Sequence, residues 1–384
     1  MMTIKKHPDD VRTWVEIDKK AIAFNYKTFR KLLGKNVALL AVVKSNAYGH
    51  HLVEFSKEAV ALGVNFLGVD SLVEGIKLRK ANITTPILVL GHTLPELFDD
   101  ARKHNIAITI SSFPMLKEAF KLKPTKKPLY VHIKVDTGMH RQGFQFEEMP
   151  RLLEQFSTID KKTPVIVQGL YTHFAEAKNP RSSDNTKRQI AEFNTWIKAF
   201  HEAGLKPVIH ASATGGALLY PHAHYDMVRI GIGMYGLWPS QDAERFLAHK
   251  MTLRPALSWY AVVSEVKAVK QSERVGYDFT ERLNRDSVLA VIPIGYWHGM
   301  PRMLSNRGRV LIHGKSARIV GRISMDMIVV DVTDIPKVAH GDVATIIGKD
   351  RKEEIRAGEL ATFAGTTHYE IVTRLNPLMK KIYT

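Results

Sequence analysis

Residues 37–51 read VALLAVVKSNAYGHH, and this stretch decides the fold. Its first seven residues form a continuous apolar run, which is typical of a parallel strand buried on both faces. A polar segment follows, and a helical pattern at 52–62 comes directly after it. The polar segment lacks the spaced glycines with which an open doubly wound sheet binds a dinucleotide. The order of strand, polar turn and helix therefore favours a different parallel architecture.

The same alternation continues to about residue 236. Further strands are expected at 64–70, 86–91, 106–110, 129–136, 165–174, 207–212 and 226–232. Helices are expected between them at 71–81, 95–105, 113–121, 147–157 and 183–203, with a short one ending at 220. Eight parallel strands joined by helices fit an α/β fold of the closed (β/α)₈ barrel type, the TIM barrel.

The pattern changes after about residue 238. The segments SVLAVIPIGY, ARIVGRISMDMIVVDV and DVATIIG are rich in β-forming residues, and a short helix is expected only near 357–364. We expect two domains, a barrel over 1–245 and a C-terminal antiparallel β domain over 246–384. Residues before about 20 are candidates for packing with the β domain.

Composition narrows the function. The 384 residues include no cysteine, which excludes a disulfide scaffold and a cysteine nucleophile. The N-terminus lacks the apolar core of a signal peptide, and no uncharged apolar stretch is long enough for a membrane span, so we expect a cytoplasmic protein. The net charge is +17, but the basic residues are scattered and no nucleic-acid-binding motif accompanies them. We expect neither nucleic acid nor membrane as a partner.

In a parallel barrel the active site lies at the carboxyl ends of the strands. Lys44 ends the first strand, where burial favours a neutral amine able to form a Schiff base, although a strand-end lysine can also simply extend into solvent. The segments SATGG (212–216) and GIG (231–233) offer backbone N–H groups to a phosphate. Together these features indicate pyridoxal 5'-phosphate as cofactor.

A metal site is the weaker interpretation. His222 and His224 have the spacing of barrel metal ligands, but they precede the eighth strand, at the mouth opposite His173. We expect no bound metal.

The assembled motifs resemble those of the alanine racemase family. They are AVVKSNAYGH, KVDTGMHRQGF, GLYTHFA, MVRIGIGMYG, VGYDF, PIGYWHGMPR, GRISMDM and HYEIVTR, in order along the chain. The resemblance as a whole extends from residue 13 to residue 377. The resemblance implies a pyridoxal-phosphate enzyme with an N-terminal barrel and a C-terminal β domain. It also implies interconversion of L- and D-alanine by two bases, which supplies D-alanine for peptidoglycan.

The resemblance further implies roles for individual residues. Lys44 would carry the cofactor and act as one base, and Tyr277 would be the second. The cofactor would also be bound by Tyr48, His173, Thr214, Arg229, Gly231, Ile232 and Tyr369. Arg229 would face the pyridine nitrogen with His173 behind it. Arg141 and the backbone of Met325 would contact the substrate, and Tyr296 and Arg302 would line the access corridor.

Three positions depart from the family pattern or leave a question. SATGG differs from the Ala-Asn-Ser or Ala-Ala-Ser forms common in the family. Ser324 stands where some members have cysteine. Asp70 stands where small residues are common. Lys134 occupies a position at which many members carry a carbamylated lysine. The sequence offers no role for Asp70.

The resemblance also implies a homodimer whose active sites are shared between chains. Three alternatives are set against it. A barrel decarboxylase of basic amino acids uses a catalytic cysteine, which this chain lacks, and a small pyridoxal-phosphate carrier lacks the β domain. A racemase of serine or lysine on the same scaffold is not separated by sequence.

Overall fold

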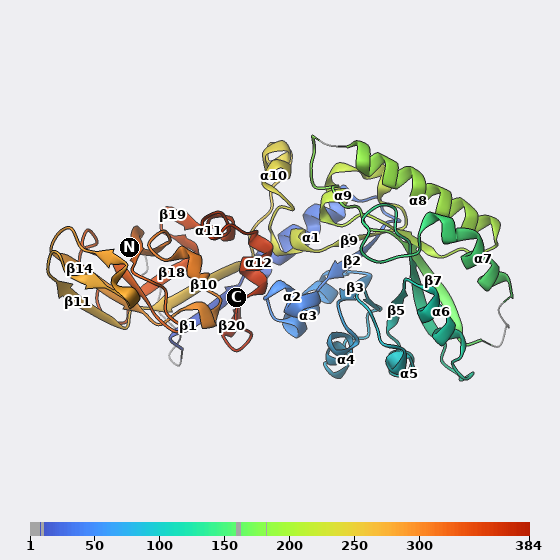
Figure 1. Ribbon diagram of the computed structural model, residues 1–384, viewed down its shortest axis with the longest axis horizontal. Helices are drawn as coiled ribbons and strands as arrows, with labels where there is room; N and C mark the ends of the chain where they lie inside the picture. Colours follow the sequence, from blue (N-terminus) through green and yellow to red (C-terminus); the bar gives the residue numbers. More distant parts are fainter. Residues whose placement is uncertain (1–7, 9–10, 159–162, 182) are drawn as a thin grey trace. The chain divides into compact units, whose positions relative to one another are not determined.

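The computed structural model describes residues 8, 11–158, 163–181 and 183–384. The chain forms two compact units (Figure 1). The first contains residues 20–47 and 52–254, and the second contains residues 1–19, 48–51 and 255–384. Most of residues 1–10, where no signal peptide is expected, lies outside the described part.

The first unit is built on eight parallel strands. They are β2 (Ala38–Val42), β3 (Phe66–Val69), β4 (Ile87–Val89), β5 (Ala107–Ile110), β6 (Leu129–Lys134), β7 (Val165–Tyr171), β8 (Val208–His210) and β9 (Met227–Ile230). Their spatial order is β8-β7-β6-β5-β4-β3-β2-β9. A parallel bridge between Ala213 and Arg229 joins the two ends of this sheet. The predicted TIM-type barrel is confirmed.

Helices follow the strands. They are α1 (Lys19–Leu32), α3 (Leu52–Leu62), α4 (Leu72–Lys80), α5 (Phe98–Lys103), α6 (Phe113–Phe120), α7 (Met149–Thr158), α8 (Asp184–Glu202), α9 (Thr214–Leu219) and α10 (Gln241–Leu247). Single turns of 3₁₀ helix occur at η1 (Pro95–Leu97), η2 (Phe146–Glu148), η3 (Pro221–Ala223) and η4 (Ile232–Tyr235). Helices α3 to α8 lie outside the strands (Figure 1). No helix in the described part of the chain combines the length and apolar character that a membrane crossing requires.

Helix α8 shows why these segments fold against the barrel. Its buried side chains include Ile190, Phe193, Trp196 and Phe200, which recur every three or four residues and form one apolar stripe. Burying this stripe stabilises the helix more than the propensities of its residues do.

The first unit extends beyond residue 245, the predicted end of the barrel. Residues 241–247 form α10, which was not predicted, and the division between the units falls after Arg254. Asn25 of α1 explains the extension. Its amide donates to the carbonyl oxygen of Arg254 (2.8 Å), and its side-chain oxygen accepts from the Arg254 N–H (2.8 Å).

The second unit contains a ten-stranded sheet. Its strands are β1 (Thr13–Ile17), β10 (Leu257–Val262), β11 (Glu265–Val269), β14 (Ser287–Ile292), β15 (Arg309–Ile312), β16 (Lys315–Val320), β17 (Ile328–Asp331), β18 (Val343–Asp350), β19 (Glu353–Ile355) and β20 (Lys380–Tyr383). The order is β11-β14-β17-β16-β15-β18-β10-β1-β20, with β19 beside β18. The pairing is antiparallel except between β1 and β20, which run parallel. The predicted β-rich C-terminal fold is confirmed, and β1 adds an N-terminal strand to it.

Shorter elements complete the second unit. They are the hairpin of β12 (Arg274–Val275) and β13 (Glu281–Arg282), the 3₁₀ turns η5 (Tyr277–Phe279), η6 (Tyr296–His298) and η7 (Arg302–Leu304), and the helices α11 (Ala357–Ala364) and α12 (His368–Thr373). Helix α11 has the predicted bounds, whereas α12 was not predicted. Six residues are too few for helical periodicity to appear in a sequence.

The Asn25 contacts predict a stability effect. Asn25→Ala would leave the part-buried N–H and carbonyl groups of Arg254 without their side-chain partner, so the free energy of unfolding should fall by about 1–3 kcal/mol. Urea denaturation followed by circular dichroism measures this loss. The matched control is Asn185→Ala, which removes an exposed amide bonded to Glu176 and should have little effect. Equal stability of the two variants would contradict the prediction.

Candidate functional site

Lys44 begins a turn of unusual backbone conformation. It starts α2 (Lys44–Tyr48) directly after β2, and Ser45, Asn46 and Ala47 have φ values of 56°, 56° and 52°. Left-handed backbone is costly for residues other than glycine, so surrounding contacts must hold it. Glu74 Oε1 accepts from the Asn46 N–H (3.1 Å). The segment expected as a polar loop is therefore a fixed turn.

The side chain of Lys44 forms an ion pair with Asp70. The distance from Nζ to Oδ1 is 3.0 Å, and the two side chains are 38% and 55% exposed. The amine is thus less buried in this chain than expected for a strand-end lysine, and it is paired. Asp70 follows β3, the neighbour of β2 in the sheet. The position of Asp70 at the end of an expected strand could have marked it as a residue of the barrel mouth, but the sequence did not indicate that it pairs with Lys44.

Arg229 lies on β9 and is 3% exposed. Its NH1 group donates to His210 Nδ1 (2.8 Å), and its NH2 group donates to the carbonyl oxygens of Ala211 (2.7 Å) and Thr172 (2.9 Å). NH2 also lies 3.1 Å from His173 Nδ1. Burial lowers the pKa of Arg229 to about 10, so the guanidinium remains charged at neutral pH. The predicted neighbours Arg229 and His173 therefore do lie together.

A chain of buried side chains continues from Arg229 into the barrel. His210 Nε2 lies 2.8 Å from His132 Nδ1, and His132 Nε2 lies 3.2 Å from Gln168 Oε1. Because Arg229 only donates, His210 must accept at Nδ1 and donate at Nε2, and His132 must then donate to Gln168. Burial lowers the pKa of His132 to about 4, and burial and then Arg229 lower that of His210 well below its usual range. Both histidines are neutral. Sequence reasoning missed them because each stands within an otherwise ordinary strand.

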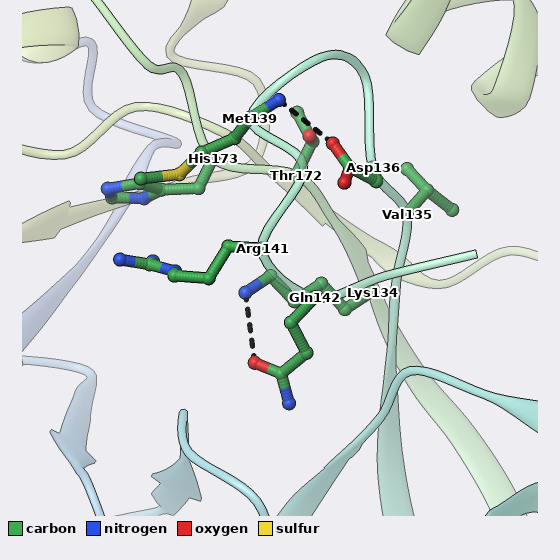
Figure 2. A pocket seen from close by; sticks show the side chains of 8 residues that line it. All are labelled: Lys134, Val135, Asp136, Met139, Arg141, Gln142, Thr172 and His173. Carbon is green, nitrogen blue, oxygen red and sulfur yellow. Dashed lines mark hydrogen bonds between the residues drawn. The ribbon is translucent and has the colours of Figure 1, made fainter. Parts of the chain in front are cut away.

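Arg141 projects from a loop that Asp136 organises (Figure 2). Asp136 Oδ1 accepts from the N–H groups of Gly138 (2.9 Å), Met139 (2.9 Å) and His140 (3.1 Å). Gly143 closes the loop at φ 139°, and a Cβ there would lie 2.6 Å from the Asp136 nitrogen. In Figure 2 the Arg141 side chain lies between His173 and the pair formed by Lys134 and Gln142.

Lys134 at the end of β6 is a buried cation. Its Nζ donates to Gln142 Oε1 (3.2 Å). Burial, followed by the charges of Arg141 and Arg229, lowers its pKa to about 8. Burial and the charges of Arg229, Arg141, Lys134 and Lys44 also lower the pKa of His173 well below its usual range. The barrel mouth therefore gathers four cationic side chains around a neutral His173.

Thr214 connects the two glycine-containing segments expected to bind phosphate. It begins α9, and its Oγ1 accepts from the N–H groups of Gly231 (3.2 Å) and Gly233 (3.3 Å), which flank Ile232. Its hydroxyl proton is left to donate. Ser212 differs from Thr214. Its hydroxyl proton is already used in a hydrogen bond to the carbonyl oxygen of Ala223 (2.8 Å). Thr214 is therefore the better phosphate ligand of the two.

Tyr48 and Tyr369 are neighbours within the second unit. Their ring centroids lie 6.2 Å apart, at the end of α2 and in α12. Burial, and then Tyr48, raise the pKa of Tyr369 above its usual value, so its phenol keeps the proton with which it can donate a hydrogen bond.

Tyr277 lies at the tip of the β12–β13 hairpin, in η5, and is 68% exposed. Gly276 precedes it at φ 77°, and Asp278 after it pairs with Arg322 (3.2 Å). The second substrate candidate, Met325, is 54% exposed, and its carbonyl oxygen accepts from the Trp297 N–H (3.0 Å). The candidate residues divide between the two units. The second unit contains Tyr277, Tyr296, Arg302 and Met325. The first contains Lys44, Arg141, His173, Thr214 and Arg229.

The two histidines weighed as metal ligands do not gather with other donors. His224 is buried and its Nε2 contacts the carbonyl oxygen of Ala217 (2.8 Å), whereas His222 is exposed. Across the residues that the structure describes, no three His, Asp or Glu side chains are grouped to hold a metal ion.

Comparison with known proteins gives a consistent result along the whole chain. The family models "Alanine racemase, N-terminal domain" and "Alanine racemase, C-terminal domain" match residues 17–239 and 256–383. An alanine racemase of Carboxydothermus hydrogenoformans is 38% identical over 372 residues, which are 96% of this chain and 99% of the relative. One of Methanococcus maripaludis is 38% identical over 374 residues, which are 96% of this chain and 98% of the relative.

Solved structures are similar as well. The alanine racemase of Bacillus anthracis with bound L-Ala-P superposes with a TM-score of 0.91 at 34% identity, covering 98% of this chain and 96% of that one. The alanine racemase of Bartonella henselae with covalently bound pyridoxal phosphate gives a TM-score of 0.87 at 28% identity, covering 97% of this chain and 100% of that one.

The lowered pKa of Lys134 predicts a pH-dependent stability. The unfolded chain keeps this proton up to the ordinary value of 10.5, whereas the folded chain releases it near 8. Below about pH 8 the folded chain carries a buried charge on Lys134, which lowers the free energy of unfolding. This destabilisation disappears as the pH rises from about 8 towards 10.5. Lys134→Met should raise the free energy of unfolding near neutral pH, and the gain should shrink by about pH 10.

Denaturant titrations of wild type and variant at several pH values measure that gain. Lys198→Met, at an exposed position on α8, is the control and should show no such trend. A gain for Lys134→Met that is the same at every pH would show that packing, not charge, causes it.

Proposed function

The chain belongs to the alanine racemase family, and from this premise we propose which of its residues interconvert L- and D-alanine with pyridoxal phosphate. The observation that carries the assignment is the full-length match to the family together with a lysine amine and a buried arginine at one barrel mouth. The reaction needs one group to remove the α proton and another to return a proton on the opposite face.

The residues present fit the cofactor. Arg229 uses NH1 and NH2 within the fold, and its Nε–H has no partner among the described residues. The hydroxyl proton of Thr214 is similarly left over. These two donors match two of the acceptors of pyridoxal phosphate, its ring nitrogen and its phosphate group. Lys44 supplies the amine that binds its aldehyde.

Pyridoxal phosphate supplies an electron sink that acidifies the α proton of a bound amino acid. Arg229 would hold the ring nitrogen by a hydrogen bond from Nε. Because its pKa is still about 10, it keeps its proton at neutral pH and does not transfer it. The buried chain through His210 and His132 fixes the guanidinium in this state. The arginine therefore limits side reactions such as transamination, which depend on a long-lived carbanion.

The other ligands follow from their hydrogen-bonding capacity. Tyr48, Tyr369 and Thr214 would donate hydroxyl protons to the phosphate, and the backbone at Gly231 and Ile232 would complete its site. His173 Nδ1 lies 3.1 Å from NH2 of Arg229 and helps to keep the guanidinium oriented. Arg141 would bind the substrate carboxylate, which requires a permanent cation held by a shaped loop. The backbone of Met325 would contact the substrate from the β domain.

Lys44 and Tyr277 are the two proposed bases. Lys44 Nζ would exchange a proton on one face of the substrate, and Tyr277 Oη would do so on the other. A phenol is mostly protonated at neutral pH, so its action as a base requires nearby positive charge. The four cations of the barrel mouth provide that charge.

A homodimer with shared sites explains the exposed apolar side chains of the second unit. Five of these side chains are 45–68% exposed: Tyr277, Tyr296, Trp297, Met325 and Met327. Their loops adjoin, because Tyr296 N–H donates to the Ser324 carbonyl oxygen (3.1 Å) and Trp297 N–H to that of Met325 (3.0 Å). Exposed apolar groups gathered in this way are typical of an interaction surface. We infer that the β domain of one chain covers the barrel mouth of its partner and excludes water there. The cytoplasmic location expected from the sequence stays a prediction.

The assignment is tested by reducing the purified protein with borohydride and mapping its peptides by mass spectrometry. The cofactor should be found on Lys44, and the unreduced protein should racemise either enantiomer of alanine. Lys57→Ala, at an exposed lysine on α3, is the control and should keep both properties. A tag on another lysine would refute the role of Lys44.

The shared site is tested by mixing two inactive variants. Lys44→Ala and Tyr277→Phe chains should each be nearly inactive, but unfolding and reassembling them together should restore about a quarter of wild-type activity. Random pairing makes half of the dimers mixed, and each mixed dimer has one site with both bases. If a tagged pull-down shows mixed dimers but no activity returns, both bases belong to the same chain.

A further inference from the structure

We propose that Asp70 is a positioning residue for Lys44. Its carboxylate holds the ε-ammonium group at the carboxyl ends of β2 and β3 whenever Lys44 is not bonded to the cofactor, and it thereby controls how readily this base takes up and returns its proton. The proposal rests on the assignment of Lys44 as a base, and it names a residue for which the sequence offered no role.

The pair has the geometry of a direct charge-assisted hydrogen bond. Lys44 Nζ lies 3.0 Å from Asp70 Oδ1. The two residues end adjacent parallel strands, in which Val42 is paired with Gly68. Both side chains therefore leave the sheet at the same edge, where a barrel carries its active site. Within the described residues, Asp70 is the carboxylate that pairs with this lysine.

The backbone on both sides of the pair is fixed by one further carboxylate. Glu74 Oε2 accepts from the Asp70 N–H (2.9 Å), and Glu74 Oε1 accepts from the Asn46 N–H (3.1 Å) in the turn that begins at Lys44. Gly91 adds a third constraint. Its N–H donates to the Asp70 carbonyl oxygen (3.1 Å), and a Cβ at this position would lie 2.3 Å from that oxygen. The fold thus holds the backbones of Asp70 and Lys44 beside each other.

The surrounding charges show why Lys44 needs a partner. The charge of Lys44 acts on Lys134, which is cationic, and on His173, which is neutral, and both of these groups also interact with the cations Arg141 and Arg229. Asp136 already accepts three backbone N–H groups and serves the Arg141 loop. Repulsion from three cations would drive a charged amine away from the mouth and towards solvent. Asp70 opposes that repulsion at the position from which the amine must act.

The first test measures the amine directly and does not depend on racemisation. The full chain is freed of cofactor with hydroxylamine, and Lys44 is acylated with a trace of acetic anhydride and quantified by peptide mass mapping. Only the neutral amine reacts, and the neighbouring carboxylate favours the ammonium form. At mildly alkaline pH, Asp70→Asn should therefore be acylated at Lys44 about two to five times faster than wild type, the range expected for a half-exposed ion pair.

Two further variants make this test specific. Asp70→Glu keeps the charge and should react within about twofold of wild type. Asp100→Asn removes an equally accessible carboxylate from the Lys103 pair on α5 and should leave Lys44 unchanged. Thermal unfolding checks that each variant is folded, since Asn at 70 retains the backbone contacts. An unchanged Lys44 rate in Asp70→Asn, or the same change in Asp100→Asn, would overturn the proposal.

The second test uses the loaded enzyme and α-deuterated alanine. Two bases act on opposite faces, so slowing only the proton transfer at Lys44 must affect the two enantiomers differently. In Asp70→Asn the isotope effect should rise for the enantiomer whose proton Lys44 removes and fall for the other. A merely structural loss would change both alike, and that result would count against Asp70.

The tests separate this inference from the proposed function. If wild type racemises alanine with cofactor on Lys44 but neither readout responds to Asp70→Asn, the inference alone is wrong. If the cofactor is attached elsewhere, the assignment of Lys44 as a base fails, while the acylation rates still report on the ion pair.

Discussion

The burial of one guanidinium group governs the interior of the barrel. Arg229 is charged at neutral pH and almost fully buried, and an unpaired charge in that position would be strongly destabilising. Its two terminal nitrogens, NH1 and NH2, contact two carbonyl oxygens and the nitrogens of His210 and His173. Because the arginine only donates, its histidine partners must be neutral. A single buried charge thus fixes the tautomers of His210 and His132 in turn.

The two neutral histidines also determine which side chains pack beside them on the neighbouring strands. His132 occupies the space beside Gly169 of β7, where a Cβ would lie 2.1 Å from His132 Nδ1. Tyr171 stacks on His210 with ring centroids 4.7 Å apart and contacts Thr109 through its hydroxyl (2.8 Å). Burial raises the pKa of Tyr171 to about 12, so it too stays neutral. The side chains of His132, Tyr171 and His210 thus form a neutral network of hydrogen-bonded and stacked groups beside the Arg229 cation.

Much of this architecture could be predicted from sequence because it depends on local patterns. The continuous apolar run before Lys44 and the helix after it mark a strand–helix unit, and eight such units leave few alternatives to a barrel. The motifs placed Arg229 beside His173, and the structure has the two side chains in contact. The left-handed backbone at Ser45 was not predicted, because contacts such as the bond from the Asn46 N–H to Glu74 of another helix help to hold it. The pairing of Asp70 with Lys44 was also missed, because it depends on the conformations of two side chains at the ends of neighbouring strands.

The two basic side chains at this mouth illustrate opposite physical requirements. In the proposed mechanism Arg229 keeps its proton throughout, and the fixed acceptors around it hold the guanidinium in that state. Lys44 must change its protonation in every turnover if it is a base, and comparable burial would make one of its two states prohibitively costly. A half-exposed ion pair contributes little free energy and can be broken and re-formed cheaply. The modest strength of the Lys44–Asp70 pair is therefore suited to a group that has to act repeatedly, whereas the strength of the Arg229 network is suited to one that does not.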